Sequence, residues 1–316
     1  MWIYLILILF ILLFIALLFV FFSMAFVRKN SSNITDVENS SYLKPFIEKL
    51  RPGIDFIDNH PFEEVSILSF DGLKLYGRYY TNNSDKTVIL VHGYRSNGKH
   101  DFSGALKFYY DYGFNVLLID QRSHGKSEGR LITFGVKESF DVKDWAEFIN
   151  KKYNPKQIVL SGVSMGGGTV AFALKRGLPK NVKCVISDCG FTSPEAIIRK
   201  VGYDRFKINA KFYMPFLNAM THIFGRFSIY ESTVDALKDN KIPIIFIHGE
   251  KDNFVPVEMS REALKAAGKY GKGIFVKEAD HGLSYLVETE RVTSEITDFL
   301  NENLITGWLF HFSLIK

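Results

Sequence analysis

The 316-residue sequence has only two cysteines, which is too few for the disulfide framework of a small secreted domain. Cys184 and Cys189 also lack the spacing of a zinc site. A block of lysine and arginine is missing too, and the net charge of +5 is mild, which argues against a nucleic acid partner. With 47% hydrophobic and 23% charged residues, the composition is that of a globular chain.

Motifs for metals and nucleotides are missing as well. The sequence contains no H-E-x-x-H, no phosphate-loop lysine motif and no G-x-G-x-x-G after the first expected strand. The triplet Gly166-Gly167-Gly168 belongs to a serine motif described below. We therefore expect neither a metal nor a cofactor.

Charged side chains are absent from residues 1–27, which are almost wholly apolar. As a helix this segment would be about 40 Å long, more than the roughly 30 Å of a bilayer's hydrocarbon core. We predict an uncleaved single-pass transmembrane anchor. A cleaved signal peptide is the alternative, because Ser23-Met24-Ala25 has a small-x-small pattern. The long apolar run and the lack of a preceding basic region argue against cleavage.

Arg28 and Lys29 follow the anchor, and no basic residue precedes it. The positive-inside rule therefore favours a cytoplasmic catalytic domain at the cell membrane. Two charges leave the extracellular side open, and the scarcity of cysteine fits either compartment. Residues 28–62 are polar and are expected to form a stalk or linker. Removal of residues 1–27 is then expected to leave a soluble, folded and active domain.

Short apolar runs alternate with helical patterns over residues 63–301, which predicts an α/β fold with a mostly parallel, doubly wound sheet. The first two runs flank Asp71-Gly72 and predict an antiparallel hairpin. About eight strands are expected, at 65–70, 73–80, 87–91, 115–119, 157–160, 182–187, 244–247 and 273–277.

The alternation breaks between Ser187 and Pro243, where the gap is too long for a simple connection. Aromatic and basic residues are interleaved there, and we expect residues 191–235 to form a helical cap. Such a cap would wall an apolar substrate pocket or simply pack onto the sheet domain. The apolar C-terminal tail at 302–316 is too short to span a membrane.

Gly162-Val163-Ser164-Met165-Gly166 is the strongest chemical signal in the sequence. It follows an expected strand and opens an expected helix, as a nucleophile elbow requires. The glycines leave room for a tight turn that lifts Ser164 above the sheet. We predict that Ser164 is a catalytic nucleophile.

A serine nucleophile needs a base, and on this fold the acid and the histidine follow it in that order. Asp252 and His281 follow the expected strands 244–247 and 273–277, in loops at the carboxyl edge of the sheet. We predict that His281 is the base and that Asp252 orients it. Glu250 and Asp280 are the alternative acids.

An oxyanion hole needs two N–H donors. We expect the backbone N–H of Met165 and of Tyr94, because these residues follow the nucleophile and the third strand. Of the other histidines, His248 is expected to be structural, and His124 lies in a loop that helps to shape the site.

Five segments in this order resemble the α/β-hydrolase family over residues 63–301: HGY at 92–94, DQRSHGKSEG at 120–129, GVSMGG at 162–167, GEKDNFVP at 249–256 and DHG at 280–282. The segment at 62–80 further resembles bacterial membrane-anchored hydrolases described as serine aminopeptidase-like or BEM46-like. The resemblance implies an α/β-hydrolase fold, a Ser164–Asp252–His281 triad, a cap between the sixth and seventh strands, and ester hydrolysis without a cofactor. The family offers no counterpart for the tail.

The leading interpretation is a membrane-anchored serine hydrolase that cleaves carboxylic esters through an acyl-enzyme. Its substrate is expected to be a small-molecule ester or an acyl lipid, since an aromatic cap lies near the anchor. An amidase or peptidase would use the same three residues. A non-catalytic binding scaffold with the same fold is the remaining alternative, and the presence of all three candidates argues against it.

Overall fold

The computed structural model describes residues 2–29 and 37–304, and its centre is an eight-stranded sheet. The strand order is β1-β2-β4-β3-β5-β6-β7-β8. The β1–β2 and β2–β4 pairs are antiparallel and the others are parallel, which confirms the expected mostly parallel sheet with a hairpin at one edge. The strands are β1 Glu63–Leu68, β2 Lys74–Tyr80, β3 Lys86–Val91, β4 Asn115–Ile119, β5 Gln157–Val163, β6 Val182–Asp188, β7 Ile244–Gly249 and β8 Gly271–Val276.

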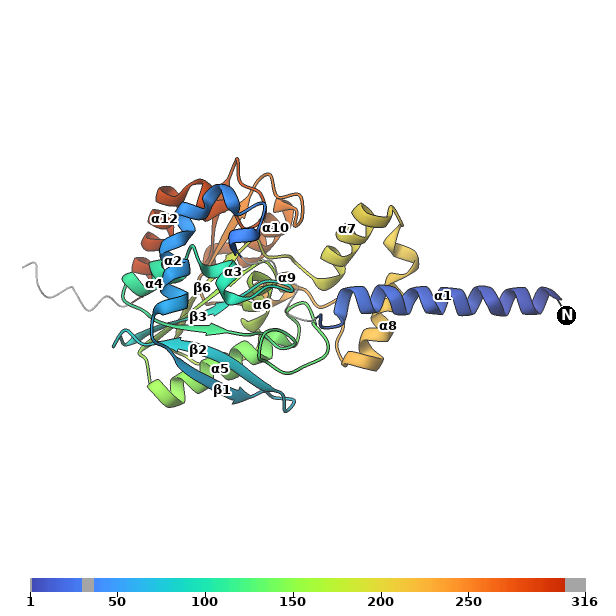
Figure 1. Cartoon of the computed structure of the whole chain (residues 1–316), viewed down its shortest axis with the longest axis horizontal. Coiled ribbons are helices and arrows are strands. Elements are labelled where there is room, and N and C mark those ends of the chain that lie inside the picture. Colours follow the sequence, from blue (N-terminus) through green and yellow to red (C-terminus); the bar gives the residue numbers. More distant parts are fainter. Residues whose placement is uncertain (1, 30–36, 305–316) are drawn as a thin grey trace, which may run out of the picture.

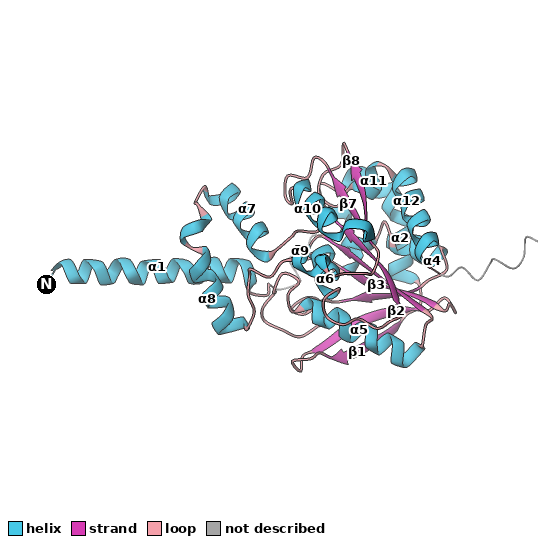
Figure 2. Cartoon of the chain, turned by 180° about the vertical axis from the view of Figure 1, so that it is seen from behind, coloured by secondary structure: helices cyan, strands magenta, loops and turns pink. Residues whose placement is uncertain are grey.

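Helices cover both faces of the sheet, because alternate residues of a strand point to opposite sides. In β3, Val88 and Leu90 belong to the core that packs under α2, α4, α11 and α12. Ile89 and Val91 belong to the core under α5, α6, α9 and α10 (Figures 1 and 2). These helices are α2 Ile47–Asn59, α4 Leu106–Asp111, α5 Glu138–Tyr153, α6 Met165–Ala173, α9 Thr233–Lys238, α10 Val257–Ala267, α11 Ser284–Val287 and α12 Thr289–Asn303, with the short α3 Gly98–Phe102 before α4.

Much of the segment expected to be a stalk is instead part of the folded domain. Leu50, Ile54 and Ile57 are buried in the core under α2, and a Cβ at Gly53 would lie 1.7 Å from the backbone oxygen of Ser103. The linker expected at 28–62 is therefore wrong for α2. Leu50, Ile54 and Ile57 are spaced four and three residues apart, so they lie on one side of the helix, and that apolar side packs onto the sheet domain.

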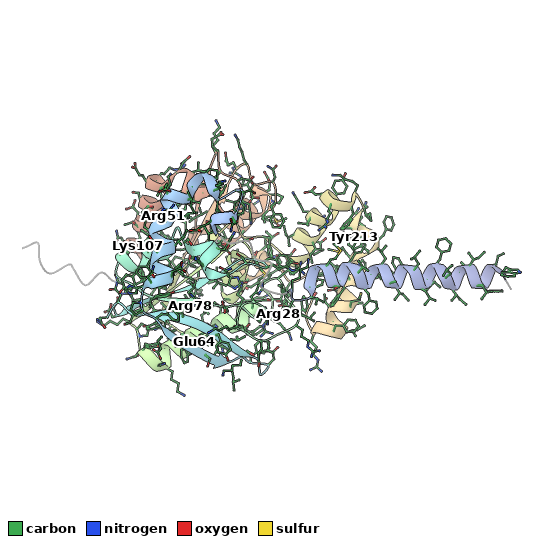
Figure 3. All side chains as sticks on the ribbon, viewed as in Figure 1. Arg28, Arg51, Glu64, Arg78, Lys107 and Tyr213 are labelled. Atoms are coloured by element: carbon green, nitrogen blue, oxygen red, sulfur yellow. The ribbon has the colours of Figure 1, made fainter. Side chains whose placement is uncertain are left out.

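The first helix, α1 Trp2–Phe26, is long and apolar enough to cross a membrane, but it is joined closely to the domain. Its last turns place Leu18, Phe22 and Phe26 in a core cluster with residues of the cap and of the loop after β4. Just beyond it, the Arg28 guanidinium donates hydrogen bonds of 2.7 Å to the backbone oxygens of Ser127 and Gly125 (Figure 3). The core contacts of Leu18, Phe22 and Phe26 argue against the expectation that residues 1–27 can be removed without effect on the folded domain.

The insert between β6 and β7 contains helices α7 Pro194–Phe206 and α8 Met214–Gly225, which form the cap. Both helices lie beside the C-terminal half of α1, and the rest of α1 projects beyond them (Figures 1 and 2). Tyr213, labelled in Figure 3, faces α1 from the connection between the two helices. The C-terminal tail lies outside the described residues from residue 305 onward.

Candidate active site

Ser164 occupies a sharp turn between β5 and α6, with φ +56° and ψ −116°. This is a left-handed backbone conformation that side-chain-bearing residues rarely adopt. Only glycine fits two residues before Ser164 and two residues after it. A Cβ at Gly162 would lie 2.1 Å from the oxygen of Gly166, and a Cβ at Gly166 would lie 1.8 Å from the oxygen of Val91. The two glycines of the motif therefore make the turn sterically possible.

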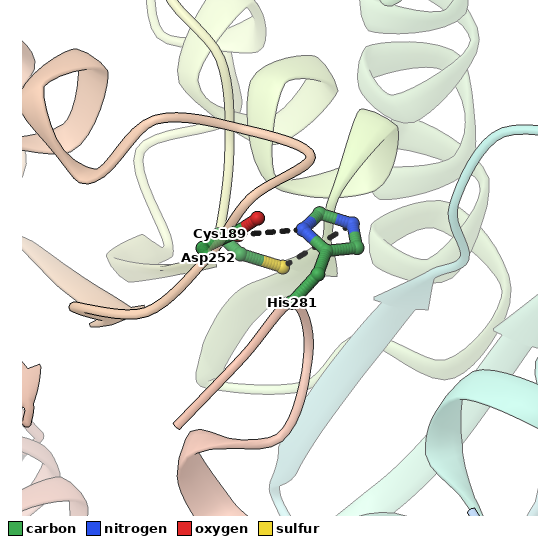
Figure 4. A group of neighbouring side chains, drawn as sticks. All are labelled: Cys189, Asp252 and His281. Atoms are coloured by element: carbon green, nitrogen blue, oxygen red, sulfur yellow. Dashed lines mark hydrogen bonds and ion pairs between the residues drawn. The ribbon is translucent and has the colours of Figure 1, made fainter. Parts of the chain in front are cut away.

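Three loops at the carboxyl edge of the sheet bring Ser164, His281 and Asp252 together. Ser164 Oγ lies 2.9 Å from His281 Nε2, and His281 Nδ1 lies 2.7 Å from Asp252 Oδ2 (Figure 4 shows the latter pair). An ionised carboxylate only accepts hydrogen bonds, so Nδ1 donates to it and Nε2 is free to accept from the serine hydroxyl. Ser164 is 9% exposed, so its hydroxyl is sheltered from bulk water.

Asp252 is held in place by more than His281. Its Oδ1 accepts 2.8 Å hydrogen bonds from the backbone N–H groups of Phe254 and Val255, and its Oδ2 lies 3.1 Å from His248 Nε2. Burial works against ionisation of this carboxyl. The hydrogen bonds from His248, His281 and Val255 outweigh that effect and hold the pKa of Asp252 below its usual range. Asp252 therefore stays a carboxylate at neutral pH.

His248 is structural, as expected, and it supports the loop that carries Asp252. It is fully buried, with Nδ1 2.7 Å from Ser260 Oγ and Nε2 also 2.9 Å from the oxygen of Val255. It thus ties α10 to the loop that carries Asp252. The sequence signal available was its position four residues before Asp252, at the end of β7.

The two alternative acids point elsewhere. The Asp280 carboxylate accepts a 2.7 Å hydrogen bond from the backbone N–H of His281, so it caps the loop rather than the imidazole ring. Glu250 pairs with Arg261 at the surface. Of the three carboxylates considered, only Asp252 contacts the His281 ring.

Tyr94 and Met165 are both placed to supply backbone donors beside Ser164. Met165 is the first residue of α6, and the loop of Tyr94 comes so close that a Cβ at Gly93 would lie 3.3 Å from Ser164 Cβ. Neither N–H has an acceptor among the residues that the structure describes. An oxyanion hole needs two such N–H donors, and the backbone N–H groups of Tyr94 and Met165 stay our candidates for them.

The loop that carries Tyr94 is fixed by the segment at 120–129. His124 Nε2 accepts a 2.9 Å hydrogen bond from the backbone N–H of Arg95, and Gln121 N donates to His92 Nε2 at 3.1 Å. Burial and the neighbouring His92 lower the pKa of His124 to about 3. His124 is therefore neutral and acts as an acceptor, in line with the shaping role expected for it.

Two cavities meet at Ser164. One, of about 290 Å³, lies between α1 and the cap and has mainly apolar walls, which include Phe21, Phe191 and Ile197. The other, of about 580 Å³, lies on the α2–α3 side and has mixed walls, with polar side chains such as Ser40 and His100 beside apolar ones such as Leu43 and Leu286. A bound molecule with one apolar and one polar end fits this arrangement.

Cys189, Asp252 and His281 offer ligand atoms within 4.8 Å of one another, a grouping that invites comparison with a metal site (Figure 4). Burial raises the pKa of the Cys189 thiol well above its usual value, so it remains protonated, whereas metals bind thiolate. The other two residues already bond to each other. The donor set therefore does not fit a metal.

Asp188 is a further buried carboxyl beside these groups. Its Oδ1 is buried without a hydrogen-bond partner among the described residues. Burial raises the pKa of Asp188 to about 6, despite the nearby His248 and His281. The backbone oxygen of the same residue accepts a 2.8 Å hydrogen bond from Ser164 N, which helps to hold the serine turn.

Comparison with known proteins shows which families and structures the chain is similar to. A family profile described as alpha/beta hydrolase fold matches residues 86–219. The chain is similar to protein YqkD of Bacillus subtilis, with 23% identity covering 70% of this chain and 72% of YqkD. It is also similar to protein bem46 of Schizosaccharomyces pombe, with 29% identity covering 55% of this chain and 53% of bem46. Among solved structures it resembles an esterase of Pyrococcus furiosus, with 28% identity, a TM-score of 0.65, and coverage of 79% and 94% of the two chains.

The sheet order, the serine turn and these likenesses define a class of protein: the chain belongs to the α/β-hydrolase superfamily. Within that superfamily it is a BEM46-like member. Its fold and these likenesses support a hydrolase.

Proposed function

We propose that this chain is a serine hydrolase that cleaves carboxylic esters through an acyl-enzyme on Ser164. The observation that carries the proposal is the line of contacts from Ser164 Oγ to His281, 2.9 Å, and from His281 to Asp252, 2.7 Å. A serine hydroxyl is a weak nucleophile until a base accepts its proton. Here the base, His281, contacts the Ser164 hydroxyl, and the Asp252 carboxylate contacts and orients His281.

In the proposed reaction Ser164 Oγ attacks the ester carbonyl while His281 Nε2 takes the hydroxyl proton. The negative charge that develops on the carbonyl oxygen faces the N–H groups of Tyr94 and Met165. His281 then returns the proton to the departing alcohol. In the second half, His281 activates a water molecule that attacks the acyl-enzyme and releases the carboxylic acid.

The two cavities support an acyl ester of a polar alcohol as substrate. The cavity beside α1 and the cap offers aromatic and aliphatic walls to an acyl chain. The cavity on the α2–α3 side offers hydroxyl, imidazole and carboxylate groups to the alcohol part and to water. A monoacylglycerol or a lysolipid has this division into an apolar and a polar part.

We further propose that α1 is retained as a membrane anchor. Tyr94 Oη donates to the backbone oxygen of Ala25 at 2.8 Å, and Arg95 donates to Met24 at 2.8 Å. Cleavage near Ser23-Met24-Ala25 would remove partners of the loop that forms the site. A cytoplasmic domain is supported by Arg28 and Lys29, although Arg28 is also bound by the domain itself.

The test is labelling of membranes that contain the full chain by a fluorophosphonate probe. We expect the wild type to be labelled and Ser164→Ala to be unlabelled. In a separate assay, we expect Ser164→Ala to reduce the rate of ester turnover by roughly 10⁴-fold or more. Parallel assays compare acetate with longer acyl esters, and esters with aminoacyl amides. A folded wild type without labelling would favour the scaffold alternative, and faster turnover of amides would contradict the ester assignment.

A further inference from the structure

The cap carries an apolar surface on its outer side. Among the described residues, Phe212 is 77% exposed and Ile223 is 71% exposed, although both are large hydrophobic residues. An exposed apolar patch of this kind marks a surface that meets a protein or a membrane. We call the set the cap face; it consists of Phe206, Ile208, Phe212, Phe216, Ile223 and Phe224.

The cap face is continuous with the candidate membrane helix. The rings of Phe14 and Phe216 are 5.3 Å apart, and those of Phe19 and Phe224 are 5.7 Å apart. A third ring contact joins α1 to the end of α7 at Phe206. The cap therefore lies along the C-terminal half of α1, as Figure 1 shows, and both present apolar side chains outward.

The length of α1 decides how deep the cap lies. The part of the helix before the first of these contacts runs from Trp2 to Leu13 and measures about 18 Å. A hydrocarbon core is roughly 30 Å thick and requires about 20 helical residues. If α1 spans it, about eight residues beside the cap, roughly 12 Å of helix, also lie within the hydrocarbon.

We propose that the cap enters the hydrocarbon region of the bilayer beside α1, and that the substrate reaches Ser164 from within that leaflet. The occupant of the cap face is thus the lipid of the membrane that α1 crosses. This inference rests on the proposed function and deepens it, because it makes the substrate a bilayer-resident acyl lipid. The depth of roughly 12 Å is somewhat more than the roughly 5–10 Å to which interfacial apolar helices are buried.

The charges on the cap fit this placement. Lys207 and Lys211 are exposed on the connection between α7 and α8, and they form no ion pair within the part of the chain that the structure describes. Arg226 is likewise exposed at the end of α8. Long basic side chains extend to the headgroup layer while their stems lie in apolar surroundings, and they attract anionic lipids.

The apolar cavity supplies the route from the bilayer to the serine. Its walls come from the two elements at membrane depth, with Phe21 and Met24 on α1 and Phe206 at the end of α7. Ser164 lies at its inner end. An acyl chain that enters between α1 and α7 meets mainly apolar side chains, with Arg205 and Arg95 also in the lining, before its ester group reaches the site.

The first test measures depth in vesicles of phosphatidylcholine and phosphatidylglycerol. The comparison is between Phe216→Trp and Phe70→Trp, each in the full chain with Trp2→Phe and Trp308→Phe. Phe216 and Phe70 are both 50% exposed, and Phe70 lies in the turn between β1 and β2, outside the cap. With acyl-brominated lipid, we expect at least roughly threefold stronger quenching for Phe216→Trp. Equal quenching of the two variants overturns the inference.

The second test separates access to substrate from catalysis. Phe212→Asp combined with Ile223→Asp places two carboxylates on the cap face, away from both cavities. We expect turnover of a vesicle-embedded acyl lipid to fall about tenfold or more, because charge is excluded from hydrocarbon, while a short soluble ester is turned over as before. Equal turnover of both substrates by this variant and the wild type contradicts lateral entry.

The two proposals fail in different ways. Quenching is measured in the Ser164→Ala background as well, because insertion into the bilayer needs no catalysis. Quenching without probe labelling refutes the hydrolase proposal and leaves the cap in the membrane. Labelling without quenching refutes the membrane position of the cap and leaves the hydrolase.

Discussion

At the scale of single residues, the contacts of the site divide into those that a sequence motif indicates and those that it does not. Ser164 was predicted because its neighbouring glycines have a steric reason that is visible in the sequence. The structure brings it together with His281 and Asp252, and their catalytic roles stay a proposal. The support given by His248 was missed, since a hydrogen bond between a strand end and a loop depends on the loop's path.

Asp188 gives a prediction about pH and stability. Burial raises its pKa from 3.8 to about 6, so the folded protein holds this proton more tightly than the unfolded chain does. The stability due to this proton is present below pH 4 and is lost as the pH rises through 6. Asp188→Asn removes the cost of the buried charge. Above pH 6 we therefore expect the variant to have a higher free energy of unfolding than the wild type, by up to about 3 kcal/mol. Its unfolding temperature is expected to be higher as well.

Thermal unfolding at pH 4 and at pH 8 measures this difference. Asp235→Asn is the control, because Lys238 beside it lowers the pKa of that exposed carboxyl. The control is expected to show no gain at pH 8. If Asp188→Asn raised the unfolding temperature by the same amount at pH 4 and at pH 8, the result would contradict a buried Asp188 carboxyl that ionises between these pH values.

At the scale of elements, the strands were predictable and the packing of short helices was not. The apolar runs fixed the eight strands to within a few residues, because buried parallel strands are continuous in hydrophobicity. Helix α2 was taken for part of a stalk, since Pro52 lies inside it and polar residues surround its apolar side. Its packing depends on Gly53, whose missing side chain allows contact with Ser103.

The turn between β5 and α6 gives a prediction with a matched control in the same helix. Gly166→Ala places a Cβ 1.8 Å from the backbone oxygen of Val91, which cannot move without distorting β3. We expect a loss of about 3 kcal/mol or more. At Gly168 the nearest atom to a new Cβ is 3.4 Å away, on the ring of Phe191. Gly168→Ala is expected to be neutral or stabilising by up to about 1 kcal/mol.

Denaturant unfolding of the detergent-solubilised full chain compares the two glycine variants. Probe labelling is measured beside it, because a distorted turn also displaces Ser164. A loss of the same size in both variants would show that the helix disfavours any side chain there, and would remove the special role of Gly166.

At the scale of the whole molecule, the sequence predicted the parts and missed how two of them meet. The sequence predicted both the apolar N-terminal helix and the aromatic cap. It predicted that the helix contacts lipid and that the cap packs on the sheet domain, and it did not predict a contact between the two. The N-terminal run is apolar on all sides and the insert exposes several aromatic side chains, so hydrophobicity alone does not show that they pack on each other. The contact joins residues about 200 positions apart, such as Phe14 and Phe216, and the fold brings them together.

That contact reverses the expected outcome of truncation. Removing residues 1–27 takes away Leu18, Phe22 and Phe26, each contributing about 2 kcal/mol of burial, out of the roughly 5–15 kcal/mol that stabilises a domain. It also removes the backbone oxygens that hold Arg95. We expect the truncated chain to aggregate, or to lose probe labelling in detergent while the full chain retains it.

A shorter deletion is the control for this prediction. Removing Trp2–Leu13 leaves in place the ring contacts between α1 and the cap, which begin at Phe14, and the core residues Leu18, Phe22 and Phe26. In detergent this variant is expected to match the full chain in unfolding temperature and in labelling. If the chain without residues 1–27 were equally stable and equally labelled, then α1 would serve only as an anchor. The packing of Phe22 and Phe26 against the cap would then contribute nothing to the site.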